Sequence, residues 1–162
     1  QGKLNNIFFT HQEMGFNYGM TNINASIGLG QFKILKKIIY KKKKIYEKYL
    51  EIFNDNKDIK LLKFRNDTKP NYWMNSIFVK KLNYEKLKKI IKKINNLGIE
   101  VRPLWYPCHK QNFLKKFEKF RIKNSESYFK KVICLPSSFF LRESEIIYIS
   151  NTIKNVIKKE IR

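Results

Sequence analysis

The feature that most constrains this chain is a stretch from Gly15 to Phe32 that contains no charged side chain. Over the whole chain, by contrast, 30% of the residues are charged. Charged side chains are rarely buried unless they are paired, and buried segments therefore tend to lack them. We expect this stretch to be buried in a core, covered by another chain, or part of a site that excludes competing charge.

The same stretch has the sequence of a loop that runs directly into a helix. Thr21 is a favourable N-cap residue, and apolar periodicity begins at Ile23. Asn17 and Asn22 supply neutral amides beside the expected helix N-terminus, where backbone N–H groups and the helix macrodipole favour an anion. The pattern therefore predicts a loop that faces an anionic ligand such as a phosphate.

One apolar stripe continues through residues 22–54 and predicts a single long helix. The stripe consists of Ile27, Ile34, Ile38, Ile45, Tyr49 and Ile52. Its first turns are small or apolar on all sides, and Gly28 and Gly30 inside a helix usually indicate the close approach of another backbone. We expect the front half of this helix to be buried and the back half, which carries Lys41 to Lys44, to lie on a surface.

The rest of the chain alternates strand and helix patterns. Strands are predicted over 59–64, 72–79, 99–102 and 132–135, and helices over 84–97 after the cap Asn83, from 124 or 125 to 131, and over 143–161. Residues 103–112 form an irregular loop, a helical turn is expected within 112–120, and Gly98 is the expected C′ residue of the helix before it. This order favours an α+β layer in which helices pack on a small, mostly antiparallel sheet.

Composition limits the classes of function. The net charge of +22 suggests nucleic-acid binding, but the excess is mostly Lys spread along the whole chain beside much Ile, Asn, Phe and Tyr. That joint bias is what A/T-rich codons produce, so we interpret the Lys residues as solvated faces and keep a polyanion-binding surface as the alternative. No apolar run approaches the roughly 20 residues of a membrane helix and no leader is recognised, so we expect a cytoplasmic protein.

Cysteine and histidine offer little chemistry. Cys108 and Cys134 form no disulfide framework, and we interpret them as reduced thiols. His11 and His109 lack the further ligands that a zinc site needs, so no metal is predicted. A catalytic pair of Cys108 with His109 is disfavoured because sequence neighbours rarely present both side chains to one reacting atom.

Three motifs in order resemble the DegT/DnrJ/StrS family of pyridoxal-phosphate-dependent sugar aminotransferases. The first motif, residues 15–28, reads Gly-Phe-Asn-Tyr-Gly-Met-Thr-Asn-Ile-Asn-Ala-Ser-Ile-Gly and is similar to the family's Gly-Tyr-Asn-Tyr-Arg-Met-Thr-Asn-Ile-Gln-Ala-Ala-Leu-Gly. The second, residues 98–109, reads Gly-Ile-Glu-Val-Arg-Pro-Leu-Trp-Tyr-Pro-Cys-His, and the third, residues 134–138, reads Cys-Leu-Pro-Ser-Ser. His11-Gln12-Glu13 and Gln31 also resemble family positions.

The resemblance implies what the chain holds and what it lacks. The Schiff-base Lys, the Asp on the pyridinium nitrogen and the main phosphate loop lie upstream of the first motif in the family, and nothing before Gly15 fits them. The chain also begins without Met, so we expect the C-terminal part of a longer enzyme, inactive alone. The implied division is an entry segment and cofactor-facing loop (1–21), a long connecting helix (22–54) and a small C-terminal α+β domain (55–162).

The resemblance also assigns site residues. Asn17 would reach the phosphate of pyridoxal phosphate in the partner subunit of a homodimer, and Tyr18 would line the same pocket. Substrate contacts to a nucleotide-linked keto-sugar are implied for Arg102, Tyr106, His109 and His11, with Trp105 or Tyr106 packing on a sugar face. No catalytic residue is assigned within the chain. One departure stands out, because Gly19 replaces the Arg that commonly follows Asn-Tyr in the family.

The implied function is transfer of an amino group, typically from glutamate, to such a sugar for surface polysaccharide. Two alternatives remain: a basic nucleic-acid-binding module, which rests on charge alone, and a non-catalytic dimerisation remnant of the aminotransferase fold, which Gly19 and the missing Lys support.

Overall fold

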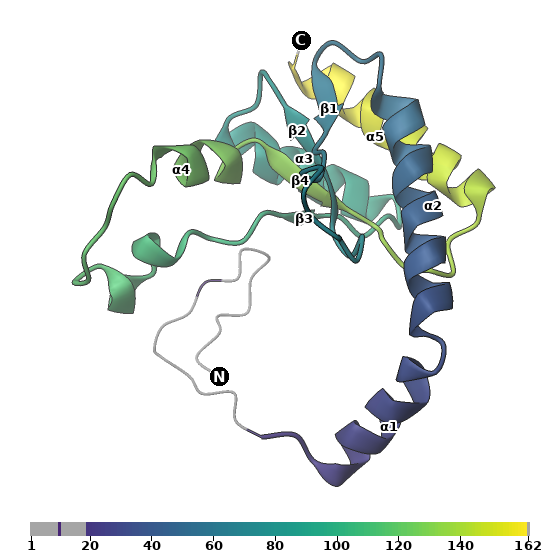
Figure 1. The fold of residues 1–162 in the computed structure, drawn as a ribbon. Helices are drawn as coiled ribbons and strands as arrows, with labels where there is room; N and C mark the ends of the chain where they lie inside the picture. The colour runs from purple at the N-terminus through teal and green to yellow at the C-terminus, as the bar shows by residue number, and fades with distance from the viewer. Residues whose placement is uncertain (1–9, 11–18, 162) are drawn as a thin grey trace.

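The structure is a computed structural model that describes residue 10 and residues 19–161. Five α-helices and four strands follow one another along this part of the chain (Figure 1). Their bounds are α1 (Asn22–Phe32), α2 (Leu35–Phe53), β1 (Ile59–Leu61), β2 (Asn75–Val79), α3 (Tyr84–Asn96), β3 (Arg102–Pro103), α4 (Lys123–Phe129), β4 (Val132–Leu135) and α5 (Glu143–Ile161), with short 3-10 turns at Cys108–Lys110 and Asn112–Leu114.

The four strands form one sheet in the order β1-β2-β4-β3, with every neighbouring pair antiparallel. This confirms the predicted α+β class with a small antiparallel sheet. Ile59 lies opposite Val79, and Ile77 lies between Leu61 on one side and Ile133 on the other. Because side chains directly opposite each other point to the same face, these residues give the sheet one continuous apolar face.

Three helices bury that apolar face. α2 packs on α5 and β1, and α3 packs on α5 and β3. Each helix contributes an inward stripe with helical spacing, for example Tyr49 and Phe53 of α2, which are fully buried. In α3 and α5 the stripes consist of Leu87, Ile90, Ile91 and Ile94, and of Ile146, Ile149, Ile153 and Ile157. The core therefore lies between the sheet and this helical layer.

The opposite face of the sheet carries a different set of side chains. Ser76, Phe78 and Cys134 point to this face, since they alternate with the core residues along β2 and β4. Phe78 contacts Tyr128 of α4, with ring centroids 5.4 Å apart. The loop that follows β3 and helix α4 therefore reach this second face.

The single long helix predicted for residues 22–54 is two helices in the structure. α1 ends at Phe32 and α2 begins at Leu35, because Ile34 leaves the helical backbone region with φ −108° and ψ 6°. α1 lies apart from the sheet and its helices (Figure 1). All residues of α1 are exposed, so the predicted burial of the front half does not occur within the described part of this chain. Among the described residues, no atom outside the backbone of α1 and the adjoining residues lies within 4 Å of the position that a Cβ would take at Gly28 or Gly30.

Several local predictions are confirmed. β4 and α5 have the predicted bounds, Thr21 and Asn83 accept N-cap hydrogen bonds from the amides of Asn24 and Lys86, and Gly98 has a left-handed φ of +78°. The strands predicted over 59–64, 72–79 and 99–102 are shorter or displaced, and α4 begins at Lys123 without the predicted side-chain cap. Among the described helices, none is long and apolar enough to cross a membrane.

Candidate functional site

The candidate site is a cavity of about 390 Å³ at the sheet edge formed by β3 and β4. Glu100, Arg102, Pro103 and Trp105 of the second motif and residues 134–138 of the third motif line it together. Lys42 of α2 and the pair Trp73 and Met74, which precede β2, complete the lining. Two motifs that are about 30 residues apart in sequence thus meet at one cavity.

Strand register explains how Arg102 and Cys134 come together. Arg102 of β3 and Ser76 of β2 both lie directly opposite Cys134 of β4. The three side chains therefore share the sheet face opposite the core that α2, α3 and α5 cover. Ser76 donates a hydrogen bond to the sulfur of Cys134 at 3.5 Å, and burial raises the pKa of the Cys134 thiol. Cys134 is thus a protonated, structural thiol beside the cavity.

The third motif is held by hydrogen bonds from α2 and β2. The hydroxyl of the buried Tyr49 donates to the carbonyl of Pro136 at 3.1 Å, and the Lys42 ammonium donates to the carbonyl of Ser137 at 2.7 Å. Asn75 donates from its backbone and side-chain amides to Oγ of Ser137 at 3.2 Å and 3.1 Å. These bonds fix the backbone of residues 136–138 as a rigid wall of the cavity.

Two cations and one carboxylate contribute charge to the lining. Arg102 donates from Nε to Oε1 of Glu100 at 2.9 Å and also pairs with it through Nη2. Burial lowers the pKa of Lys42. The charged groups of the lining are therefore Lys42, Arg102 and Glu100, with a net charge of +1, which suits an anionic ligand.

Tyr106 and His109 do not line this cavity. Nε2 of His109 lies 2.8 Å from Oε1 of Glu126 in α4, and the ring of Tyr106 packs edge-on against Phe129 at 5.3 Å. Only 13% of the His109 side chain is exposed. The structure thus separates the predicted substrate residues: Arg102 and Trp105 face the cavity, whereas Tyr106 and His109 anchor the same loop on α4.

Three predicted site residues, His11, Asn17 and Tyr18, lie outside the described residues. The described neighbours are Gly19, in the left-handed region, and Thr21, whose hydroxyl accepts from the Asn24 amide at 3.2 Å and opens α1. Their side chains are uncharged, and the first turn of α1 contains no acidic residue. The described start of α1 therefore brings no negative side chain to this place.

Sequence reasoning missed Trp73 and Lys42. Trp73 fell inside a predicted strand, and Lys42 belonged to a run of lysines interpreted as solvated. No local pattern could have placed Lys42 here, since its partner Ser137 is 95 residues away. Trp73 had a weak signal, because it follows Asn71 and Tyr72 after Pro70, in a segment that mixes turn residues with aromatic ones.

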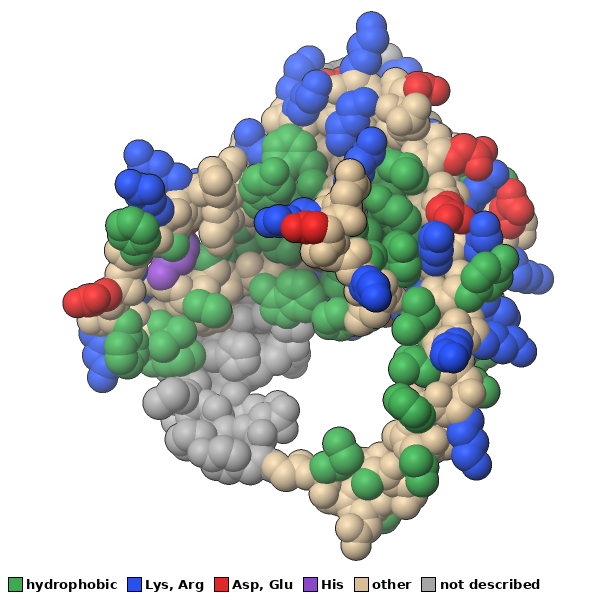
Figure 2. Space-filling view, in the orientation of Figure 1, with side chains coloured by type: hydrophobic (Ala, Val, Ile, Leu, Met, Phe, Trp, Pro, Cys, Tyr) green, Lys and Arg blue, Asp and Glu red, His purple; other side chains and the backbone are tan. Residues whose placement is uncertain are grey.

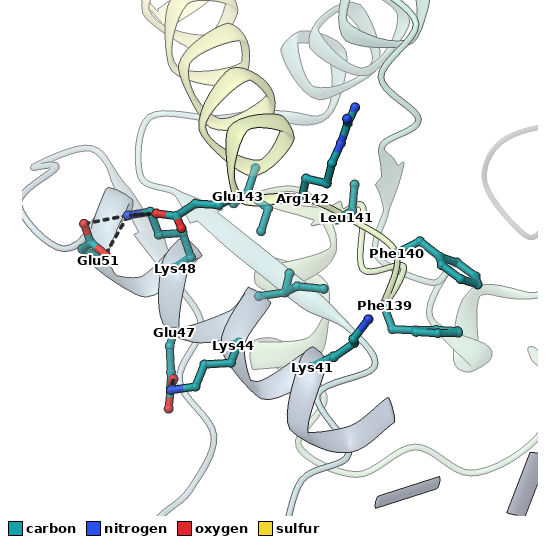
Figure 3. A pocket seen from close by; sticks show the side chains of 12 residues that line it. Lys41, Lys44, Glu47, Lys48, Glu51, Phe139, Phe140, Leu141, Arg142 and Glu143 are labelled. Atoms are coloured by element: carbon teal, nitrogen blue, oxygen red, sulfur yellow. Dashed lines mark hydrogen bonds and ion pairs between the residues drawn. The ribbon is translucent and has the colours of Figure 1, made fainter. Parts of the chain in front are cut away.

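A second cavity, of about 500 Å³, lies between α2 and the loop before α5 (Figure 3). Three of the cations that line it, Lys44, Lys48 and Arg142, lie close to carboxylates. Lys48 lies 2.9 Å from Glu143 and 3.1 Å from Glu51, and Lys44 lies 2.9 Å from Glu47. No residue of the second motif (98–109) or the third motif (134–138) lines this cavity, so we do not take it as the candidate site.

The fold indicates the class of protein. A small antiparallel sheet covered by helices and reached through helices α1 and α2 is the arrangement of the matching solved structures, which are fold-type I sugar aminotransferases. PseC of Helicobacter pylori, an aminotransferase involved in the biosynthesis of pseudoaminic acid, has a TM-score of 0.78 at 20% identity, with 98% of this chain and 43% of PseC covered. Spr1654 from Streptococcus pneumoniae, in its PMP-form, has a TM-score of 0.77 at 26% identity, with 87% and 36% covered.

The sequence comparison gives the family. The profile of the DegT/DnrJ/EryC1/StrS aminotransferase family matches residues 1–154, and the chain belongs to this family. The GDP-perosamine synthase of Escherichia coli O157:H7 is 32% identical over 146 residues, which cover 90% of this chain and 38% of that protein. The GDP-perosamine synthase of Vibrio cholerae is 31% identical over 156 residues, which cover 96% and 42%. The chain thus spans about two fifths of the length of these relatives.

Proposed function

We propose that this chain forms the C-terminal part of a pyridoxal-phosphate-dependent aminotransferase that transfers an amino group from glutamate to a nucleotide-linked keto-sugar. Membership of the aminotransferase family and the likeness to two GDP-perosamine synthases support the proposal. The product would be an amino sugar for surface polysaccharide. The reaction would take place in the cytoplasm, where glutamate and nucleotide-linked sugars are made.

The observation that carries the proposal is the meeting of the second and third motifs at one cavity. Arg102, Lys42 and the wall formed by residues 136–138 line the same cavity. A structural remnant would need the fold but not a cationic cavity lined by two motifs. An enzyme that binds a diphosphate-linked substrate needs both a fixed wall and a positive charge.

Asn17 and Tyr18 are the proposed cofactor contacts. Pyridoxal phosphate, when bound, supplies the electron sink for amino-group transfer. Asn17 would donate a neutral amide to the cofactor phosphate held by the partner subunit, and Tyr18 would line the pocket beside it. The support from the described residues is that Gly19, Thr21 and the start of α1 bring no competing negative charge to this place.

The substrate contacts divide into two kinds. Arg102 would pair with an anionic oxygen of the substrate, since its side chain lies at the cavity and a guanidinium matches the geometry of such oxygens. His109 and Tyr106 would act through the loop, because their contacts with Glu126 and Phe129 fix the segment that carries Arg102 and Trp105. His11 remains a proposed substrate contact from the entry segment.

The proposal also assigns partners to α1. Its apolar side chains are exposed, including Ile23 at 72% and Phe32 at 70%. Figure 2 shows hydrophobic side chains gathered on α1 and continuing along one side of α2, with most Lys and Arg side chains on the outer side. We infer that the cofactor-binding domain of the longer protein and a second subunit cover this surface. Residues 1–21, 22–54 and 55–162 would then be the entry loop, the connecting segment and the small domain.

The test is cofactor binding by the longer polypeptide that includes this chain. We expect Asn17→Ala to raise the Kd for pyridoxal phosphate by roughly tenfold, as the loss of a hydrogen bond to a charged group implies. Asn66→Ala, in an exposed loop, is the matched control and should leave the Kd unchanged. Equal Kd values for the Asn17 variant and the parent protein would contradict the assignment.

A further inference from the structure

The chain contains two tryptophans, and the structure brings both to the candidate site. Trp73 comes from the segment before β2 and Trp105 from the loop after β3. Their ring centroids are 5.9 Å apart and the ring planes are inclined by 51°. Trp73 is 56% exposed and Trp105 is 43% exposed, so each ring presents much of its surface to solvent. Large aromatic residues kept at a surface are typical of binding sites.

The backbone before Trp73 is held in an uncommon conformation. Tyr72 has a φ of +54°, in the left-handed region that non-glycine residues rarely adopt. Its ring is anchored between Tyr46 of α2 and Phe64, with centroids 5.4 Å from each. Trp73, the next residue, lies against Trp105 at the cavity. Such strain persists only where surrounding contacts enforce it, and it is concentrated at functional sites.

A hydrogen bond fixes the same turn from the other side. The backbone amide of Trp73 donates to Oδ1 of Asn71 at 3.0 Å. Trp73 is therefore positioned by Tyr72 and Asn71 rather than by burial of its own ring. The core does not need this indole, since none of the core residues packed between the sheet and helices α2, α3 and α5 is a tryptophan.

Positive charge lies beside the two rings. Arg102 and Lys42 line the same cavity, and among the described residues that line it Glu100 is the one carboxylate. The cavity volume of about 390 Å³ falls within the range of small-molecule sites, about 300–1,000 Å³. An exposed aromatic surface next to a net positive charge fits a ligand with a flat ring joined to an anionic group.

We propose that Trp73, together with Trp105, forms a stacking platform for the base of a nucleoside diphosphate, while Arg102 pairs with the diphosphate. This inference rests on the proposed function, because the nucleotide is the part of a nucleotide-linked sugar that has both a flat aromatic ring and negative charge. A base is favoured over the hexose because bases stack on aromatic side chains with useful affinity and little dependence on base identity. Trp73 is thereby assigned a role in substrate recognition.

The test measures nucleotide binding by the 162-residue chain itself, without cofactor or turnover. GDP and UDP are titrated while the tryptophan emission is followed, since both indoles lie at the cavity. We expect saturable quenching by either nucleotide and none by glucose. Inorganic pyrophosphate should bind without quenching. Absence of saturable quenching by both nucleotides, or equal quenching by pyrophosphate, would overturn the platform.

A second measurement assigns the effect to Trp73. By calorimetry, Trp73→Ala should weaken GDP binding by roughly tenfold and leave pyrophosphate binding unchanged, whereas Trp73→Phe should retain most of the affinity. Tyr148→Ala, an exposed aromatic on α5, is the control. Unchanged GDP affinity in Trp73→Ala, with an unaltered far-UV spectrum and thermal midpoint, would refute the assignment.

The experiments on Trp73 can fail independently of the test of the proposed function. A chain that binds nucleotides through Trp73 while the longer protein binds no pyridoxal phosphate would keep the platform and reject the aminotransferase. If the longer protein binds the cofactor but the GDP affinity of the 162-residue chain does not depend on Trp73, the aminotransferase is kept and the platform is rejected.

Discussion

At the scale of single residues, the shape of the site depends on side chains far from it in sequence. Tyr49 and Lys42 are about two helical turns apart along α2, and each donates to a carbonyl of the third motif. Both carbonyls belong to a loop that has no strand partner at this point. The two side chains therefore satisfy the backbone carbonyls of residues 136–137, which elsewhere in the sheet would accept from a neighbouring strand.

Tyr49→Phe tests this support. The ring is fully buried and its hydroxyl has the Pro136 carbonyl as partner, so the variant keeps the packing and loses one buried hydrogen bond. We expect the free energy of unfolding to fall by about 1–2 kcal/mol, measured by urea denaturation. Tyr40→Phe, at an exposed position of the same helix, should change it by less than about 0.5 kcal/mol. A Tyr49 variant as stable as the parent chain would show that the bond contributes nothing.

The sequence could predict part of the site at this scale. The motif residues Arg102 and Trp105 were found because they stand in a recognisable pattern, and both line the cavity. Trp73 and Lys42 were not found, since their roles depend on a left-handed residue at Tyr72 and on a contact across the fold. Tyr106 and His109 belong to the same motif, yet the chain turns there and directs them to α4.

At the scale of elements, the predictions that succeeded rest on burial. β4 is a run of four buried residues, and α3 and α5 have one clear apolar stripe each, so pattern and structure agree on them. The break between α1 and α2 was missed because the apolar spacing continues across it through Ile34, with no Pro to mark it. The strand predicted over 72–79 begins later, since Tyr72 is not extended and Trp73 pairs with a side-chain oxygen.

The contact between the loop after β3 and helix α4 should make the stability of the fold depend on pH. Hydrogen bonding to His109, followed by the charge of Lys110, lowers the pKa of Glu126 from its ordinary value. A carboxyl whose pKa is lower in the folded state stabilises the fold above the ordinary pKa of Glu. That stability is lost as the pH falls through the lowered value, because the folded state must then take up the proton.

Glu126→Gln removes this contribution. We expect its thermal midpoint to be lower than that of the parent chain at about pH 7 and to approach it as the pH falls through the lowered pKa of Glu126, where the parent carboxyl becomes protonated too. Glu118→Gln, which changes an exposed carboxyl nearby, should follow the parent curve. Calorimetric scans across this pH range provide the measurement, and a constant difference between variant and parent would argue against the ion pair as its source.

At the scale of the whole molecule, the chain divides into a well-packed body and an uncovered arm. The body is the sheet with α2, α3 and α5, whereas α1 contributes no buried residue (Figures 1 and 2). Helix formation in water is marginal for a segment as short as α1, and most helical stability in proteins comes from packing. The arm therefore needs a covering surface to be stable, which agrees with its charge-free sequence.

The uncovered arm predicts self-association of the 162-residue chain. Exposed apolar side chains on α1, among them Ile23 and Ile27, should drive concentration-dependent assembly in sedimentation experiments. The double variant Ile23→Lys with Ile27→Lys should shift the distribution to the monomer, while Tyr148→Lys on α5 should not. A parent chain that stays monomeric at every concentration tested would mean that this surface has little tendency to be covered.

We propose that this chain completes the active site of an aminotransferase in which pyridoxal phosphate is held mainly by other polypeptide. The most direct measurement is the visible absorption spectrum of the purified longer protein before and after addition of glutamate. We predict a cofactor band that glutamate bleaches, and no such band or turnover for the 162-residue chain with added cofactor. A longer protein without the band, or transamination by the 162-residue chain alone, would contradict the account.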